Sequence, residues 1–300
     1  MSQRRELQQH RESLGEIREI MNSMKTLAYM ESRKLERYIE AQQAVVTGIE
    51  TAAADLLHSY PGMLPPASGK PVRAWLVIGS ERGFCGDFNQ QLLAQLQEQL
   101  AGPVAGIADG DAAGDLILVV GQKLQSLLQD DPRLVVAVEG ASMAEDLASL
   151  LQQLVPHLRE LQGAHPGLEL RALYHSGKGD VVVKPVLPPF VGLAQTGVLN
   201  NIPPLLNLSP PVVLGGLAEH YLFALMFQML YASLHAENHQ RLIHMEGAVK
   251  HLDERAAELL RQGNVLRQEE ITEEIEVILL NAANLGGCCP EQERLQRQMP

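Results

Sequence analysis

The stretch with the most chemical potential is SERGFCGDFN at residues 80–89. It follows the apolar run RAWLVIG at 73–79 and precedes QQLLAQLQEQL at 90–100, which has helical spacing. A glycine-rich turn between a strand and a helix often cradles a phosphate, because the backbone N–H groups at a helix start attract anions. The first question is therefore whether this turn is a nucleotide site.

The glycines of this turn do not complete a known nucleotide motif. A dinucleotide site requires G-x-G-x-x-G, and Gly83 and Gly86 supply only its second half. A phosphate-binding P-loop requires Lys and then Ser or Thr after its last glycine, whereas Asp87 follows Gly86. An acid at the helix start would repel a phosphate. The residues favour a tight strand-to-helix turn over a nucleotide site.

Two further groups could carry chemistry. HAENH at 235–239 places two histidines four residues apart on a helix, a spacing that can hold zinc. A zinc protease needs Glu directly after the first His, but Glu237 is the second residue after it and no third ligand is evident, so a solvated helix face is the alternative. Cys85 beside Arg82 could be a reactive thiol, or a small residue that fills a turn. None of these residues requires an enzyme, a metal or a cofactor.

Composition narrows the class of protein. The chain has 300 residues, 46% of them hydrophobic, and a net charge of -12. This charge argues against a nucleic-acid surface, which needs a basic patch. No signal-peptide pattern is present, and the most apolar stretch, 211–230, contains Glu219 and His220, which favours a buried helix over a membrane span. Cys288 and Cys289 are adjacent and give no disulfide framework. The sequence predicts a soluble cytoplasmic protein.

Both ends of the chain predict long helices. A heptad that starts at Leu7 gives apolar residues at most a positions and at most d positions up to Pro61. The a positions are Leu7, Leu14, Met21, Ala28, Leu35, Gln42, Ile49 and Leu56, and the d positions are His10, Ile17, Met24, Glu31, Tyr38, Val45 and Ala52. A helix of this length needs a partner.

The predicted partner is the proline-free segment from about Val212 to Leu285. Its seam follows steps of four and three through Met245, Val249, Leu252, Ala256, Leu259, Gly263 and Leu266. After a slip of one residue it continues through Ile271, Ile275, Ile278, Ala282 and Leu285. Because a folded middle separates the two helices, we expect them to pair antiparallel.

The middle of the chain alternates between strand and helix patterns. Apolar runs at 73–79, 115–121, 133–140 and 168–176 predict buried strands, and the segments between them have helical spacing. Such alternation is typical of a parallel sheet covered on both faces. GDVVVKPVLP at 179–188 predicts an antiparallel edge strand, and prolines mark an extended loop at 188–211. The predicted fold class is α/β: a Rossmann-like central domain plus a long antiparallel coiled coil of the two terminal helices.

Four motifs in order resemble the gamma subunit of F-type ATP synthases. The family loop S-[DE]-R-G-[LF]-C-G-x-x-N fits Ser80, Glu81, Arg82, Gly83, Phe84, Cys85, Gly86 and Asn89. A family motif in the first helix fits Ile20, Met24 and Ala28, but departs at Glu31, where the family has lysine. Near the C-terminus, S-E-x-x-x-R-M-x-A-M fits Glu237, Arg241 and Met245. The closing motif fits Asn264, Arg267, Gln268, Ile271, Thr272, Glu274 and Ile275.

The resemblance implies a rotor shaft without catalytic residues, cofactor or metal. The sequence patterns divide the chain into an N-terminal coiled-coil helix at 1–60, a central Rossmann-like α/β domain at 72–210, a C-terminal coiled-coil helix at 211–285 and a tail at 286–300, which extends past the usual end of the family. The partners implied are three alpha and three beta subunits, an epsilon subunit and a membrane ring of c subunits, at the cytoplasmic face of a bacterial inner membrane. The implied partner contacts are Met24, Arg241, Gln268 and Thr272, and the implied structural loop comprises Ser80, Arg82, Gly83, Cys85, Gly86 and Asn89.

Some features depart from this resemblance. The chain is acidic, with a pI near 5.3, and its first-helix motif is diluted. These departures suggest a divergent bacterial branch. The alternative is a Rossmann-like enzyme whose terminal helices form a dimerisation stalk, and a weaker one is a coiled-coil adaptor.

Overall fold

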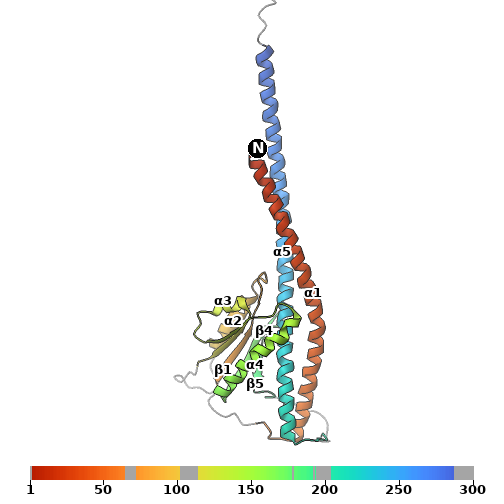
Figure 1. The fold of residues 1–300 in the computed structure, drawn as a ribbon, viewed down its shortest axis with the longest axis vertical. Helices are drawn as coiled ribbons and strands as arrows, with labels where there is room; N and C mark the ends of the chain where they lie inside the picture. Colours follow the sequence, from red (N-terminus) through yellow and green to blue (C-terminus); the bar gives the residue numbers. More distant parts are fainter. Residues whose placement is uncertain are drawn as a thin grey trace, which may run out of the picture. The chain divides into compact units, whose positions relative to one another are not determined.

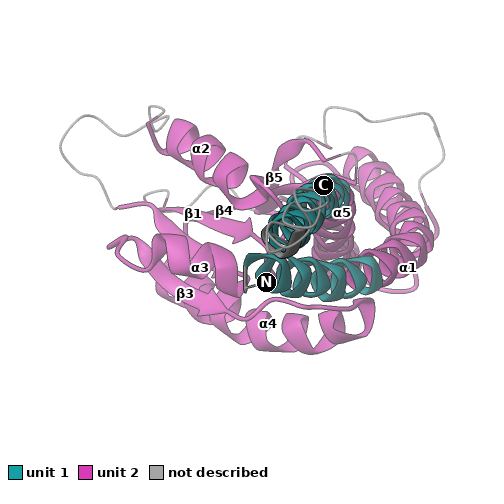
Figure 2. Ribbon diagram, turned by 90° about the horizontal axis from the view of Figure 1, so that it is seen from above, with its two compact units in different colours: residues 1–23, 247–300 teal, residues 24–246 magenta. Residues whose placement is uncertain are grey.

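The computed structural model describes residues 2–64, 72–101, 114–177, 179–191, 193 and 204–286. Helix α1 (Ser2–Ser59) and helix α5 (Pro210–Gly286) flank a region that alternates between strands and helices. The chain divides into two compact units (Figure 2): residues 1–23 with 247–300, and residues 24–246. Cys288, Cys289 and much of the predicted loop at 188–211 lie outside the described residues.

The sheet in the second unit has five strands in the order β3-β2-β1-β4-β5. These are β1 (Val72–Ile78), β2 (Leu116–Val120), β3 (Leu134–Val138), β4 (Leu168–His175) and β5 (Val181–Leu187). The first four strands pair in parallel, and β5 pairs antiparallel with β4 at the edge. The predicted strands, including the antiparallel edge, are confirmed.

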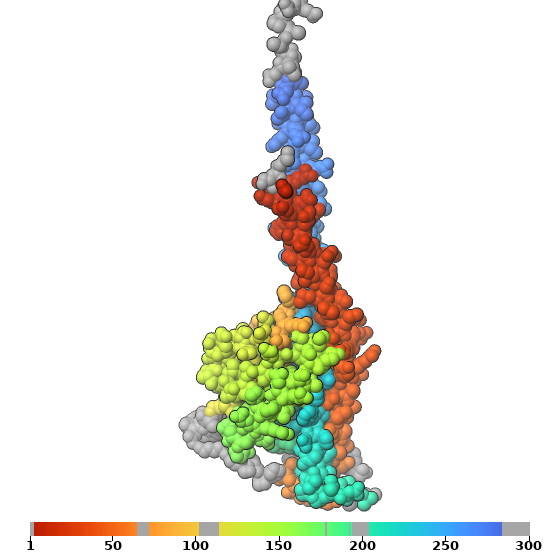
Figure 3. Space-filling model, viewed as in Figure 1, coloured from red at the N-terminus to blue at the C-terminus, as the bar shows by residue number. Residues whose placement is uncertain are grey.

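Alternation along β1 and β2 directs side chains to two different cores. On one face, Ala74 and Leu76 join the cluster that contains α4 (Leu147–Ala164), α1 and α5. On the other face, Trp75 and Val77 pack with α2 (Phe88–Ala101) and α3 (Gln122–Leu128). A short 3-10 helix, η1 (Ala144–Asp146), precedes α4. The sheet is therefore covered on both faces, and within this unit the α/β part lies against the helix pair (Figures 1 and 3).

The two long helices run antiparallel in each unit. In the first unit Arg4 pairs with Glu270 and Arg18 with Asp253. In the second unit Lys25 pairs with Glu246, and Tyr221 donates a hydrogen bond to Glu50. Because residue numbers fall along α5 as they rise along α1, these contacts confirm the predicted antiparallel pairing.

The predicted register of α1 is only half right. The a positions Ala28, Leu35 and Leu56 are buried, but the d positions Tyr38 and Val45 are 42% and 48% exposed. The second buried column lies four residues after each a position, not three, and contains Ser32, Val46 and Ala53. Two of these side chains are small, whereas the larger Tyr38 lies beside this column and stacks on Tyr231 of α5. A count of apolar residues favours the column that contains Tyr38 and Val45, because it is the bulkier one, and overlooks the buried column four residues after each a position.

The seam of α5 is confirmed up to Leu266 and wrong beyond it. Met245 and Leu259 are buried, and Val249, Leu252 and Leu266 are half-buried. The predicted continuation is exposed: Ile271 by 45%, Ile275 by 51% and Ile278 by 66%. The reason is that Arg4, near the start of α1, already pairs with Glu270, so α5 extends past its last pairing with α1.

The second half of the apolar stretch at 211–230 of α5 packs into the core. By length and composition α5 contains a stretch that could cross a membrane, and 33% of that window is buried inside the protein. Within 211–230, Tyr221, Leu225 and Met229 belong to the main hydrophobic cluster. These contacts agree with the buried helix expected there.

Candidate functional site: the loop between β1 and α2

Residues 80–89 connect the end of β1 to the start of α2 and form a hydrogen-bonded turn. Asn89 accepts a hydrogen bond from the Ser80 N–H at 3.0 Å and donates one to the Ser80 hydroxyl at 2.8 Å. Ser80 is 0% exposed and Asn89 is 7% exposed. These two residues close the loop at its base, because buried polar groups must find partners.

The apex of the loop has a left-handed backbone. Gly86 has φ of 62°, which a glycine adopts without steric cost. Phe84 has the same φ of 62° although it carries a side chain, and its ring is 54% exposed. A bulky residue at positive φ is uncommon and strained. The surroundings of the loop must therefore hold this conformation.

Glu81 fills the position where an open α/β sheet usually binds its ligand, the carboxyl edge of the strands. Its Oε2 accepts hydrogen bonds from the Gln122 N–H at 3.0 Å, at the start of α3, and from the Gly140 N–H at 2.6 Å, after β3. One carboxylate thus joins the ends of β1, β2 and β3. It also satisfies an N–H donor at the start of α3, the position that an anionic ligand would take.

A second carboxylate fills the loop from α5. Glu237 is 4% exposed, and its Oε1 accepts a hydrogen bond from the Arg82 N–H at 3.3 Å. Arg241 pairs with this carboxylate and donates to the Gly83 carbonyl at 3.2 Å and to Asn238 Oδ1 at 2.7 Å. Burial raises the pKa of the Glu237 carboxyl, and Arg241 and the backbone N–H groups of Glu81 and Arg82 oppose that shift.

These contacts show which group occupies the turn. The loop does cradle an anion, but the anion is the side chain of Glu237, and Glu81 serves the neighbouring helix start. Both positions that would attract a phosphate are occupied by carboxylates of the chain itself, which would also repel it. The geometry therefore favours a structural turn over a nucleotide site.

The expectation of a solvated face at 235–239 is wrong. His235, Glu237 and Asn238 are buried, and only His239 is exposed. Glu237 bonds to the backbone of the loop, Asn238 bonds to Leu234 and Arg241 within α5, and His235 lies 3.9 Å from Glu36 of α1. These residues therefore look solvated in the sequence although they are not. Among the described residues no group of three His, Cys, Asp or Glu side chains could hold a metal.

Cys85 is a packed residue of the turn. It is 4% exposed, and its thiol lies 3.4 Å from the Ser80 hydroxyl oxygen. Burial raises the pKa of the Cys85 thiol, which keeps it in the less reactive protonated form. The structure therefore supports the small residue that fills a turn, not the reactive thiol.

The four predicted partner contacts do not share one environment. Met24 is half-buried on α1, whereas Gln268 and Thr272 are exposed on α5, where the Thr272 hydroxyl donates to the Gln268 carbonyl at 2.9 Å. Arg241 is only 5% exposed and its guanidinium is engaged within the chain. The contact role of these four residues stays a prediction.

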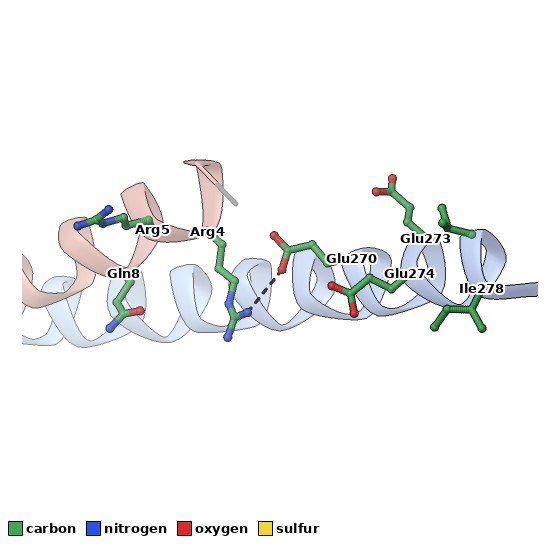
Figure 4. Close-up of a pocket in the computed structure, with 8 residues that line it drawn as sticks. Arg4, Arg5, Gln8, Glu270, Glu273, Glu274 and Ile278 are labelled. Atoms are coloured by element: carbon green, nitrogen blue, oxygen red, sulfur yellow. Dashed lines mark hydrogen bonds and ion pairs between the residues drawn. The ribbon is translucent and has the colours of Figure 1, made fainter. Parts of the chain in front are cut away.

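An open groove of about 790 Å³ lies in the first unit, beside the start of α1 (Figure 4). Its walls carry both signs of charge and two exposed apolar side chains: Arg4, Arg5, Gln8, Glu270, Glu273, Glu274, Val277 and Ile278. Arg4 reaches across it to Glu270, with the two charged atoms 3.5 Å apart. Gln268 and Thr272 lie on the same stretch of α5.

Comparison with known proteins gives one consistent result. A family model described as ATP synthase matches residues 3–285. The ATP synthase gamma chain of Clostridium novyi is 22% identical over 276 residues, which cover 89% of this chain and 93% of that one. The gamma chain of Polaromonas naphthalenivorans is 23% identical, covering 90% of this chain and 95% of that one.

Solved structures share the fold. A chain in the OSCP/F1/c-ring structure of Euglena gracilis mitochondrial ATP synthase has a TM-score of 0.63 at 15% identity, covering 97% of this chain and 98% of that one. A chain in the central stalk/c-ring structure from Tetrahymena thermophila has a TM-score of 0.51 at 17% identity, covering 76% of this chain and 99% of that one. Since the family model spans both long helices and the sheet between them, the chain belongs to the ATP synthase gamma chain family, the non-catalytic rotor subunits of the central stalk.

Proposed function

We propose that this chain couples the rotation of an ion-driven membrane ring to ATP synthesis or hydrolysis on surrounding beta subunits. The observation that carries the proposal is the antiparallel pairing of the two chain ends, which the exposed ion pairs Arg4–Glu270 and Arg18–Asp253 mark in one unit and Lys25–Glu246 marks in the other. A packed helix pair resists twisting and sliding because its side chains interlock. That is the property a shaft needs.

The proposed partners are three alpha and three beta subunits, an epsilon subunit and a ring of c subunits. Two lines support them: the relatives are gamma chains of bacterial ATP synthases, and the similar solved chains come from F1/c-ring and central stalk/c-ring assemblies. The proposed location is the cytoplasmic face of a bacterial inner membrane, as a peripheral subunit. The acidic composition fits a divergent branch of the family.

Gln268 and Thr272 are proposed as direct contacts with the subunits around the shaft, and Met24 as a third. The exposure of Gln268 and Thr272 leaves their side chains free to meet another chain. Ile275 and Ile278 on the same stretch expose more than half of their surface, which a partner would cover. Arg241 was predicted in the same set, but its buried ion pair with Glu237 favours a role inside the chain.

Co-purification tests the proposal. The chain is tagged at its C-terminus in its host, membranes are solubilised gently, and the recovered subunits are identified by mass alongside ATP hydrolysis. We expect alpha and beta subunits in threefold excess, with activity reduced by Gln268→Ala/Thr272→Ala but not by the control Gln262→Ala, an exposed position on the same helix. Recovery of the chain alone as a homodimer that carries a nucleotide would contradict the proposal and favour the enzyme alternative.

A further inference from the structure

Three buried polar residues of α5 share one face of the helix. Ser233, Glu237 and Arg241 are spaced four residues apart, which places them in line along the helix. They are 2%, 4% and 5% exposed. Burying a polar side chain costs free energy, which a hydrogen bond or an ion pair must offset. We call these three residues the polar ladder.

Each member of the ladder bonds to the backbone of the segment that runs from β1 into the loop. The Ser233 hydroxyl donates to the Ile78 carbonyl at 3.2 Å. Glu237 accepts from the Arg82 N–H at 3.3 Å, and Arg241 donates to the Gly83 carbonyl at 3.2 Å. Three successive turns of α5 therefore hold residues 78–83 by directional bonds.

The outer end of the ladder is braced within α5. Arg241 also donates to Asn238 Oδ1 at 2.7 Å and pairs with Glu237, so three of its nitrogen atoms are engaged. Charge-assisted bonds of this kind are about twice as strong as neutral ones. The guanidinium is thus fixed toward the loop and does not point at solvent.

We propose that Ser233, Glu237 and Arg241 are positioning residues that lock the carboxyl edge of the sheet to α5, so that the sheet and the helix turn together under load. This proposal rests on the rotor function proposed above. Apolar packing between α5 and the sheet resists large movements, but it is non-directional and does not by itself fix the exact alignment against small slips. Hydrogen bonds to backbone atoms weaken steeply with misalignment, so they resist such slips. The strained turn at Phe84 lies directly beyond the last bond of the ladder.

The proposal predicts a specific defect. Weakening the polar ladder should reduce the number of ions pumped per ATP hydrolysed more than it reduces the rate of ATP hydrolysis. The reason is that pumping places torque on the connection between the sheet and α5, whereas hydrolysis without pumping does not. The alternative is that Arg241 acts by direct contact with another subunit. In that case Ser233 and Glu237, which are buried, could be changed without an effect on coupling.

Three variants and one control separate these roles. Arg241→Met keeps the side-chain volume but removes every bond, and Glu237→Gln/Arg241→Met also removes the stranded carboxylate. Ser233→Ala removes only the neutral hydrogen bond to the Ile78 carbonyl, so it tests the proposal even if the Arg241 variants do not fold. Asp115→Asn is the control, since it breaks another largely buried pair of this unit, Arg73–Asp115, at the opposite ends of the strands.

The first readout is hydrogen exchange of the full chain across residues 79–88. We expect exchange to rise about tenfold or more in both Arg241 variants, because a bond to a charged group contributes about that factor to an equilibrium constant. A smaller rise is expected in Ser233→Ala, and none at these residues in Asp115→Asn. Unchanged exchange in the Arg241 variants would refute the lock.

The second readout is the pumping-to-hydrolysis ratio of the complex assembled with each variant. We expect a lower ratio in all three ladder variants and an unchanged ratio in the control. If Glu237→Gln/Arg241→Met restores the ratio, Arg241 only balances the charge of Glu237. If the ratio is normal in Ser233→Ala and low only in the Arg241 variants, Arg241 contacts another subunit directly. Either result overturns the proposal. Failure of the unmodified chain to assemble would instead overturn the rotor function, and this coupling role with it.

Discussion

Two adjacent valines of α1 test how the long helices pack. The heptad in the sequence assigns Val45 to the seam, whereas in the structure Val45 is 48% exposed and Val46 is 0% exposed. Val45→Ala and Val46→Ala are the same chemical change one residue apart on one helix. Any difference between them therefore reports packing and not helix propensity.

The expected magnitudes follow from burial. Val46→Ala removes two buried carbon groups at about 0.8 kcal/mol each, and the residual cavity brings the loss of stability to about 2–3 kcal/mol. Val45→Ala should change the stability by less than about 0.5 kcal/mol, since exposed positions rarely contribute more and alanine is the better helix former.

Thermal unfolding of the full chain, followed by circular dichroism, measures the difference. For a unit of this size about 2–4 °C is lost per kcal/mol, so we expect Val46→Ala to lower the Tm by about 4–12 °C and Val45→Ala to leave it nearly unchanged. Urea midpoints at matched m-values provide a second estimate. If Val45→Ala is the more destabilising variant, the heptad register holds and the observed seam is refuted.

Three further predictions concern the second unit. Gly86→Ala should destabilise the chain by about 1–2 kcal/mol, because φ is 62° there, whereas Gly83→Ala, with ordinary φ and its nearest neighbour at 4.0 Å, should cost under about 0.5 kcal/mol in the same urea titration. Cys85 should react with a thiol reagent at pH 7.5 at least about tenfold more slowly in the folded chain than in urea, since burial raises its pKa; equal rates by peptide mass spectrometry would contradict this. The hydrogen bonds from Arg133 lower the pKa of Asp131, so its contribution to stability is present above the ordinary aspartate value of about 3.9 and is lost as the pH falls through the lowered pKa; Asp131→Asn should flatten that part of an acid titration, and an unchanged acid limb would argue against the pair.

The sequence predicted the elements better than the contacts between them. Strand and helix patterns placed the five strands, their directions and both long helices, because alternation and proline spacing are local properties. The register of α1 could not be predicted in the same way: the columns three and four residues after Leu35 both offer plausible seam residues, and the side chains of α5 decide between them.

The site shows the same division. The loop motif at 80–89 was visible in the sequence, but the partner of its backbone was not, because Glu237 is distant in the chain and polar. Buried polar residues resemble solvated ones until the segment they bond is known. The available signal was the four-residue spacing of Ser233, Glu237 and Arg241, which places three polar side chains on one face of the helix.

The carboxylate in the loop has a consequence for regulation. Glu237 is attached to the same chain as the N–H group that it binds, so its effective concentration at the loop far exceeds that of free anions in solution. Cellular phosphate or nucleotide therefore competes poorly for this position. The conformation of the turn is set when the chain folds, and it stays independent of the metabolic state whose energy the complex converts.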